Sequence, residues 1–149
     1  MLANAELASA ITDGLLITVI DKGSMGGGVI EELEEEGFGE RVVAVPFDSS
    51  PDDEVARRRH TDKRALMLWG LRELILSAEL HLPHGDESEM LADEMASVKW
   101  GETASGKKRI EAKTDVKKRL GRSPDVSDSV ALAVMPTAVE EDWEPIFVT

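Results

Sequence analysis

Apolar residues along the chain fall into short unbroken runs and into helical repeats, and their alternation predicts a mixed α/β fold. The run LLITVI at 15–20 is apolar except for Thr18, which is typical of a strand buried on both faces. GGGVIEELEEEG at 26–37 predicts a helix that ends at a glycine, and ERVVAVPF at 40–47 predicts a second buried strand. This order favours a parallel, right-handed crossover between the two strands.

The rest of the chain predicts helices and one hairpin. A long amphipathic helix over 61–80 can be capped by Thr61 or Asp62. Residues 98–100 and 107–113 flank a glycine-containing loop and predict a β-hairpin. The inner face of the long helix is expected to carry Leu66, Trp69, Leu71 or Leu74, and Leu76 or Leu80. Residues 48–60 predict a polar loop or short helix. Further helices are expected at 3–12, 86–98 and 114–121. A final helix is expected to begin with Ser123 as N-cap and Pro124 in first position, and to extend up to Pro136.

The periodic pattern ends near residue 136. One domain is therefore expected at 1–136, followed by a flexible acidic tail at 137–149. The chain has no cysteine, which excludes disulfides and thiolate zinc sites. Its apolar runs are too short to cross a bilayer, and its start lacks the basic region of a signal peptide. A cytoplasmic protein with no membrane partner is expected.

The net charge of -13 argues against a nucleic-acid partner, but the distribution of charge weakens that argument. Of the 17 Lys and Arg residues, five lie between Arg57 and Arg64 and nine between Lys99 and Arg122. Segregated charge of this kind can leave one basic face on an acidic protein. Solvated helix faces are the plainer interpretation of the same pattern.

The first predicted strand leads into a glycine-rich turn. Asp21 is followed by four glycines between Gly23 and Gly28. Asp21 could hold a metal, the glycines could bind a phosphate, or the segment could be only a tight strand-to-helix turn. Dinucleotide binding would use Asp48 as the acid on a ribose, but the spacing G-x-x-G-G-G does not match that motif. A P-loop is excluded because no Gly-Lys-Ser/Thr follows.

A metal site needs more than Asp21. A carboxylate at the carboxyl end of a buried strand lies where open α/β sheets place their sites. Hard cations such as Mg²⁺ require several oxygen ligands. Asp125 and Asp128 are three residues apart in the predicted last helix and so share one of its faces. Taken alone, these two residues are also typical of ordinary acids at a helix start.

The segments ITVIDKGSMGGGVIEELEEEGF, VVAVPF, DKRALMLWGLRELI, LHLP and RIEAKTDVKKRLGRSPDVSDSVALA follow one another in this order. Together they resemble the C-terminal nuclease domain of the large terminase subunit of tailed bacteriophages, over about Ala5 to Met135. RLGRSPDVSDSVALA is the most specific segment and departs mainly at Ser129, where alanine is usual.

The resemblance implies an RNase H-like fold with flanking helices, here a partial sheet that lacks the family's first strands. It implies double-stranded DNA cleavage with Mg²⁺ or Mn²⁺ held by three carboxylates. Asp21 matches the family's fourth-strand acid, while Asp128 and, next to it, Asp125 match the acids of the final helix. Two metal ions would then activate water and stabilise the leaving oxygen. The expected phosphate contacts are Arg57, Arg58, Arg59, Lys107, Lys108, Arg109, Lys117, Lys118 and Arg122.

The chain is therefore interpreted as a fragment or remnant of a terminase nuclease domain, whose family cleaves concatemeric DNA during genome packaging in the bacterial host. Because the first catalytic strand is missing, impaired or absent activity is expected, together with an exposed sheet edge. Another terminase chain or a second copy could complete the sheet. The alternative is a non-catalytic binding module on the same scaffold, including nucleotide binding at the glycine-rich turn.

Overall fold

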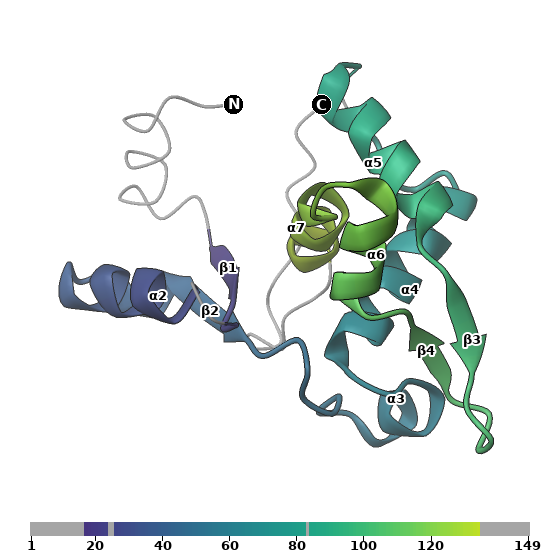
Figure 1. Ribbon diagram of the computed structural model, residues 1–149. Helices are drawn as coiled ribbons and strands as arrows, with labels where there is room; N and C mark the ends of the chain where they lie inside the picture. Colours follow the sequence, from purple (N-terminus) through teal and green to yellow (C-terminus); the bar gives the residue numbers. More distant parts are fainter. Residues whose placement is uncertain (1–16, 24–25, 83, 135–149) are drawn as a thin grey trace.

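The computed structural model describes residues 17–23, 26–82 and 84–134 and shows a mixed α/β fold (Figure 1). The predicted helix at 3–12 and the predicted tail at 137–149 lie outside these residues. No helix in the described part is long and apolar enough to span a membrane. In chain order the elements are β1 (Thr18–Asp21), α2 (Gly26–Glu35), the 3-10 helix η1 (Gly39–Arg41), β2 (Val42–Val45), α3 (Glu54–Arg59), α4 (Lys63–Leu76), α5 (Asp86–Ser97), β3 (Trp100–Glu102), β4 (Lys108–Ile110), α6 (Lys113–Leu120) and α7 (Asp125–Val134).

β1 and β2 form a two-stranded parallel sheet, and α2 connects them, so the predicted strand–helix–strand unit is confirmed. Asp21 is the last residue of β1 and lies opposite Val45 in the register. β1 extends one residue beyond the apolar run, to Asp21, because backbone pairing with β2 continues there. The next residue is still bonded to β2, since the Lys22 N–H donates to the Val45 carbonyl at 2.9 Å. Beyond α2 the chain turns at Gly37, whose φ of +89° favours glycine.

The predicted hairpin is confirmed as a second, separate sheet made of β3 and β4. It is joined to the end of α3 by backbone contacts. His60 pairs with Lys108 in a parallel bridge, and the Thr61 N–H donates to the Lys108 carbonyl at 3.1 Å. Asp62, not Thr61, caps α4, because its carboxylate accepts from the Ala65 N–H at 2.7 Å.

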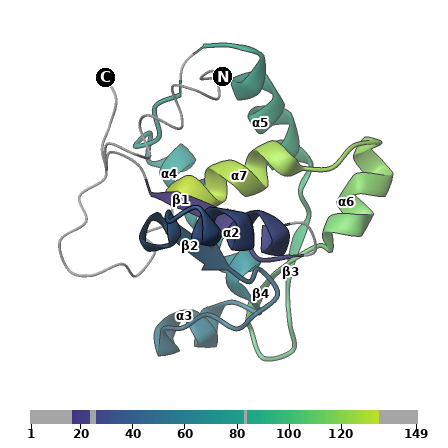
Figure 2. The ribbon, with the colours of Figure 1, turned by 90° about the vertical axis from the view of Figure 1, so that its left-hand side faces the viewer.

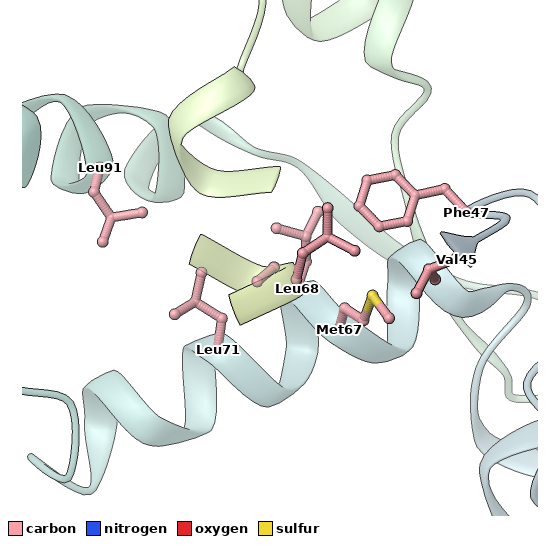
Figure 3. Close-up of a cluster of buried hydrophobic side chains, with 8 residues drawn as sticks. Val45, Phe47, Met67, Leu68, Leu71 and Leu91 are labelled. Carbon is pink, nitrogen blue, oxygen red and sulfur yellow. The ribbon is translucent and has the colours of Figure 1, made fainter. Parts of the chain in front are cut away.

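The hydrophobic core joins the end of β2 to three helices (Figure 3). α7 lies against α4, α5 and β1, so it connects the helices with the parallel sheet (Figures 1 and 2). The core residues are Val45, Phe47, Met67, Leu68, Leu71, Leu91, Ala131 and Leu132.

The buried face of α4 differs in part from the prediction. Leu71 is fully buried as expected, and Leu80 packs at the edge of the core, but Leu76 is 64% exposed. Leu66 and Trp69 are only half-buried. Apolar side chains surround most of α4, so their spacing could not select one face, and packing against α7 decides it.

α7 begins at Asp125, and Ser123 does not act as its N-cap, which corrects the prediction. The Ser123 hydroxyl donates to the Asp125 carboxylate at 2.7 Å instead of accepting from the helix. The Ser127 N–H in the first turn donates at 2.7 Å to the carboxylate of Glu94 on α5. α7 is therefore capped by a side chain from another helix.

Candidate functional site

The structure places the predicted acids on two elements that contact each other. Asp125 and Asp128 lie in the first turns of α7, and α7 packs against β1, which ends at Asp21 (Figure 2). The half-buried Asp21 carboxylate accepts from the Gly23 N–H at 3.1 Å. This local bond accounts for part of the glycine-rich turn without any ligand.

Asp128 is buried between two cations. Its Oδ1 accepts from Arg64 Nε at 3.1 Å, and its Oδ2 lies 2.9 Å from Lys113 Nζ. Lys113 forms an ion pair with Oδ2, and Oδ2 accepts from no other donor in the described part of the chain. Two partners of opposite charge compensate the burial of this carboxylate, which would otherwise be strongly unfavourable.

Lys113 bridges the two acids of α7, since its Nζ also lies 2.9 Å from Asp125 Oδ1. Burial alone would lower the pKa of Lys113, but its contacts with the two carboxylates outweigh burial and raise that pKa above its usual value. The hydrogen bond from Ser123, followed by that from Lys113, lowers the pKa of Asp125. The ammonium group therefore occupies the space between two carboxylates that were predicted to hold a cation.

Replacement of Lys113 by methionine is expected to lower stability in a pH window that these shifts define. The pKa of Asp125 is lowered from 3.8 in the folded protein. Its contribution to the free energy of unfolding is therefore present above pH 3.8 and is lost as the pH falls through the lowered pKa. The pKa of Lys113 is raised from 10.5 in the folded protein. Its contribution to the free energy of unfolding is therefore present below pH 10.5 and is lost as the pH rises through the raised pKa. Urea titrations should show the largest difference from the wild type near neutral pH. A difference that is constant from pH 2 to pH 11 would contradict the proposed pairing.

Two further residues hold this site and were not foreseen. Arg64 also donates from Nη1 to the Glu111 carbonyl at 3.0 Å, which links α4 to the segment before α6. Glu94 is fully buried, accepts from Ser127 and forms an ion pair with Arg122. An acid three residues after the core residue Leu91 is the one sequence signal that marks Glu94 as inward-facing.

The predicted phosphate-contacting residues divide into two groups. α3 and the hairpin lie side by side, which brings Arg57 to Arg59 near Lys107 to Arg109 (Figure 1). α6, which carries Lys117 and Lys118, lies away from α3 (Figure 2). Within the described part, no acidic partner lies within 4.0 Å of Arg57, Arg59, Lys107, Arg109 or Lys117.

The remaining predicted cations are already engaged inside the protein. Arg58 pairs with Glu54 on α3, and Lys118 pairs with Asp115 at 3.2 Å. Lys108 Nζ lies 3.7 Å from the centroid of the Trp69 ring, and Arg122 pairs with Glu94, as described above. These side chains would have to exchange a partner to bind DNA.

The donor chemistry of the acids fits Mg²⁺ or Mn²⁺, because both ions prefer carboxylate oxygens. In residues 17–23, 26–82 and 84–134 no three acids or histidines are grouped closely enough to hold a metal ion. Lys113 Nζ lies 2.9 Å from Asp128 Oδ2 and occupies the position where a metal ion would contact that oxygen. The metal role of Asp21, Asp125 and Asp128 therefore stays a prediction, and it requires Lys113 to move.

No protein-family model matches the chain, and no characterised protein matches it in sequence. Its fold, however, is that of a terminase nuclease domain. The chain is similar to the nuclease domain of the large terminase subunit gp2 of bacterial virus Sf6, with a TM-score of 0.65, 21% identity, and coverage of 88% of this chain and 70% of that one. A mutant of that domain with manganese gives a TM-score of 0.61, 21% identity, and coverage of 83% and 67%. The corresponding mutant with calcium gives a TM-score of 0.61 and 21% identity, with coverage of 83% of this chain and 66% of that one.

Proposed function

We propose that the chain is a metal-dependent DNA nuclease domain of the terminase type, with RNase H-like topology, that acts in the cytoplasm of a bacterial host. One observation carries the proposal. The helix with Asp125 and Asp128 packs on the strand that ends at Asp21, in a fold shared with nuclease domains solved with manganese or calcium. The proposed substrate is double-stranded DNA, including the concatemers from which phage genomes are packaged.

In this function Asp21, Asp128 and Asp125 would hold Mg²⁺ or Mn²⁺. The bound metal would supply a more acidic water and stabilisation of the leaving oxygen. The protein itself contributes the position of Asp128, which Arg64 fixes from α4. Phosphate contacts would come from the unpaired cations on α3 and the hairpin.

We also propose that cleavage by this chain alone is weak. Asp128 is 3% exposed and faces two cations, so a divalent ion must displace Lys113 before it can bind. Like charges at such distances repel each other strongly in a buried site. A further terminase chain, or a second copy of this one, could supply an additional carboxylate and shift this balance.

Asp21→Asn is expected to remove any stabilisation by Mn²⁺. If Asp21 is a ligand, Mn²⁺ should raise the melting temperature of the wild type, since a ligand that binds only the folded state stabilises it. In the presence of Mn²⁺ the wild type should also nick supercoiled plasmid DNA, and Asp128→Asn should abolish this nicking. Asp93→Asn on α5 is the control, because Asp93 is exposed and has no partner in the described residues. An equal Mn²⁺ effect in the wild type and Asp21→Asn would refute the metal site.

The second candidate is a non-catalytic binding module. It is supported if Mn²⁺ stabilises the protein and DNA binds but no nicking occurs at any metal concentration. Nucleotide binding at the glycine-rich turn has a structural competitor, because Gly26 packs against the Asp21 carbonyl and Gly23 donates to the Asp21 side chain. Both glycines have packing or turn functions in the absence of any nucleotide.

A further inference from the structure

The junction between α3 and the hairpin contains a buried histidine. His60 directly follows α3, is 6% exposed, and pairs with Lys108 of β4 in a parallel bridge. Beside it, the Thr61 N–H donates to the Lys108 carbonyl, as described above. The imidazole ring therefore belongs to the residue at which the two segments meet.

One nitrogen of the His60 ring has no partner. Nδ1 lies 3.3 Å from the Ala56 carbonyl oxygen, which can only accept, so Nδ1 carries the proton of the neutral ring. Nε2 is buried and has no hydrogen-bond partner in the described residues. Protonation of Nε2 would place a positive charge and a donor without an acceptor at this buried position, which is unfavourable.

The charged groups around His60 also disfavour its protonated form. They are Arg59 at the end of α3, Lys108 on β4 and Asp62 before α4. Burial, together with the two cations, holds the pKa of His60 below its usual value of 6.5, although the Ala56 carbonyl and Asp62 oppose this shift in part. The ring is therefore protonated more readily when water reaches it than in its place at the junction.

Few other contacts hold this junction closed. α3 has six residues and none of them is buried, and the two strands of the hairpin have three residues each. Segments with few buried side chains open locally at a low free energy. The hairpin has a separate anchor, because the Trp100 ring packs edge-on against Trp69 of α4 with 4.9 Å between the ring centroids. Opening of the junction therefore does not require the hairpin to leave α4.

We propose that His60 makes this junction a pH-sensitive switch, in which protonation of the ring opens the contact between α3 and the hairpin. Opening and proton uptake are then linked, so the open population should rise up to tenfold for each pH unit below 6.5, until the His60 pKa of the closed junction is reached. Opening also separates the unpaired cations of α3 from those of the hairpin. The affinity for duplex DNA should therefore fall with the pH, and this consequence alone rests on the proposed function.

The test is an NMR titration of the metal-free full chain from about pH 7.5 to about pH 5, above the usual range of carboxylates. The His60 ring should titrate below pH 6.5, and the Thr61 amide signal, which reports on the contact, should change over the same range. His60→Gln has no imidazole to protonate and should keep its Thr61 signal unchanged. His84→Gln is the matched control, because it removes an exposed histidine outside the junction and should behave as the wild type.

A His60 ring that titrates at or above pH 6.5, or a Thr61 signal that stays constant while His60 titrates, would overturn the switch. Neither measurement uses a variant, so a His60→Gln chain that failed to fold would not remove the test. An equal pH response of Thr61 in the wild type and His60→Gln would also overturn it. Duplex DNA should bind the wild type several-fold more weakly at the lower pH, and His60→Gln equally at both. If Thr61 responds as expected but no DNA binds at either pH, the proposed nuclease fails and the switch stands.

Discussion

Glu94→Ala is expected to destabilise the protein by about 3 kcal/mol, the lower end of the cost of breaking a buried ion pair. The substitution leaves the buried Ser127 N–H of α7 without its acceptor and Arg122 without its partner. The lower value applies because the Arg122 side chain is 37% exposed and water can solvate it. For a domain of this size the melting temperature should fall by roughly 10 °C.

Two companion variants separate the contributions of Glu94. Glu94→Gln keeps an acceptor for the Ser127 N–H and loses only the ion pair, so an intermediate loss of stability is expected. Glu89→Ala removes an exposed acid from the same helix and should change stability by no more than about 0.5 kcal/mol. Equal melting temperatures for Glu94→Ala and Glu89→Ala would show that Glu94 does not cap α7.

Gly26→Ala is expected to destabilise the protein by about 3 kcal/mol, the upper part of the range for overpacking. A Cβ at this position would lie 1.8 Å from the Asp21 carbonyl oxygen and 3.2 Å from Ile20 Cγ2. The first contact is with backbone and cannot be relieved by a side-chain rotation. The start of α2 or the end of β1 must therefore shift, and with it Asp21.

Gly28→Ala is the control, and its expected change in stability is opposite in sign to that of Gly26→Ala. Apart from its chain neighbours and the backbone of α2, no heavy atom in the described residues lies within 4 Å of a Cβ built at Gly28. The residue is inside α2. Alanine is preferred to glycine in a helix by about 1 kcal/mol, so this variant should be slightly more stable than the wild type. Denaturant titration of both variants tests the pair, and similar stability for the two would contradict the close packing at Gly26.

Local chemistry along the chain was enough to predict much of the fold. The strand that ends at Asp21, its parallel partner and the hairpin follow from apolar runs bounded by glycine, proline and polar residues. The position of Asp125 and Asp128 in the first turns of the last helix was likewise predictable from the SPD segment. These features depend on residues that are neighbours in sequence.

The surroundings of the acids could not be predicted, because they depend on residues far apart in the chain. Arg64 and Asp128 are separated by 64 positions, and Glu94 and Ser127 by 33. Nothing in the local pattern distinguishes Arg64 from the exposed arginines of α3. For Glu94 the pattern offers only its three-residue spacing from Leu91. Tertiary packing determines these partners. It likewise determines that Leu71 on α4 is buried and Leu76 is exposed.

The β1–α2–β2 unit contributes few buried side chains to the molecule. Its strands have four residues each, and Ile30 is the only buried residue of α2. Asp125 and Asp128 lie on α7, which contributes Ala131 and Leu132 to the main core, whereas β2 contributes only Val45 as a buried core residue. Short units with few buried side chains open locally at a lower free energy than the global one. Amide hydrogens of β1 and β2 should then exchange faster than those of α4 and α7, and the position of Asp21 relative to α7 should vary with the same local opening.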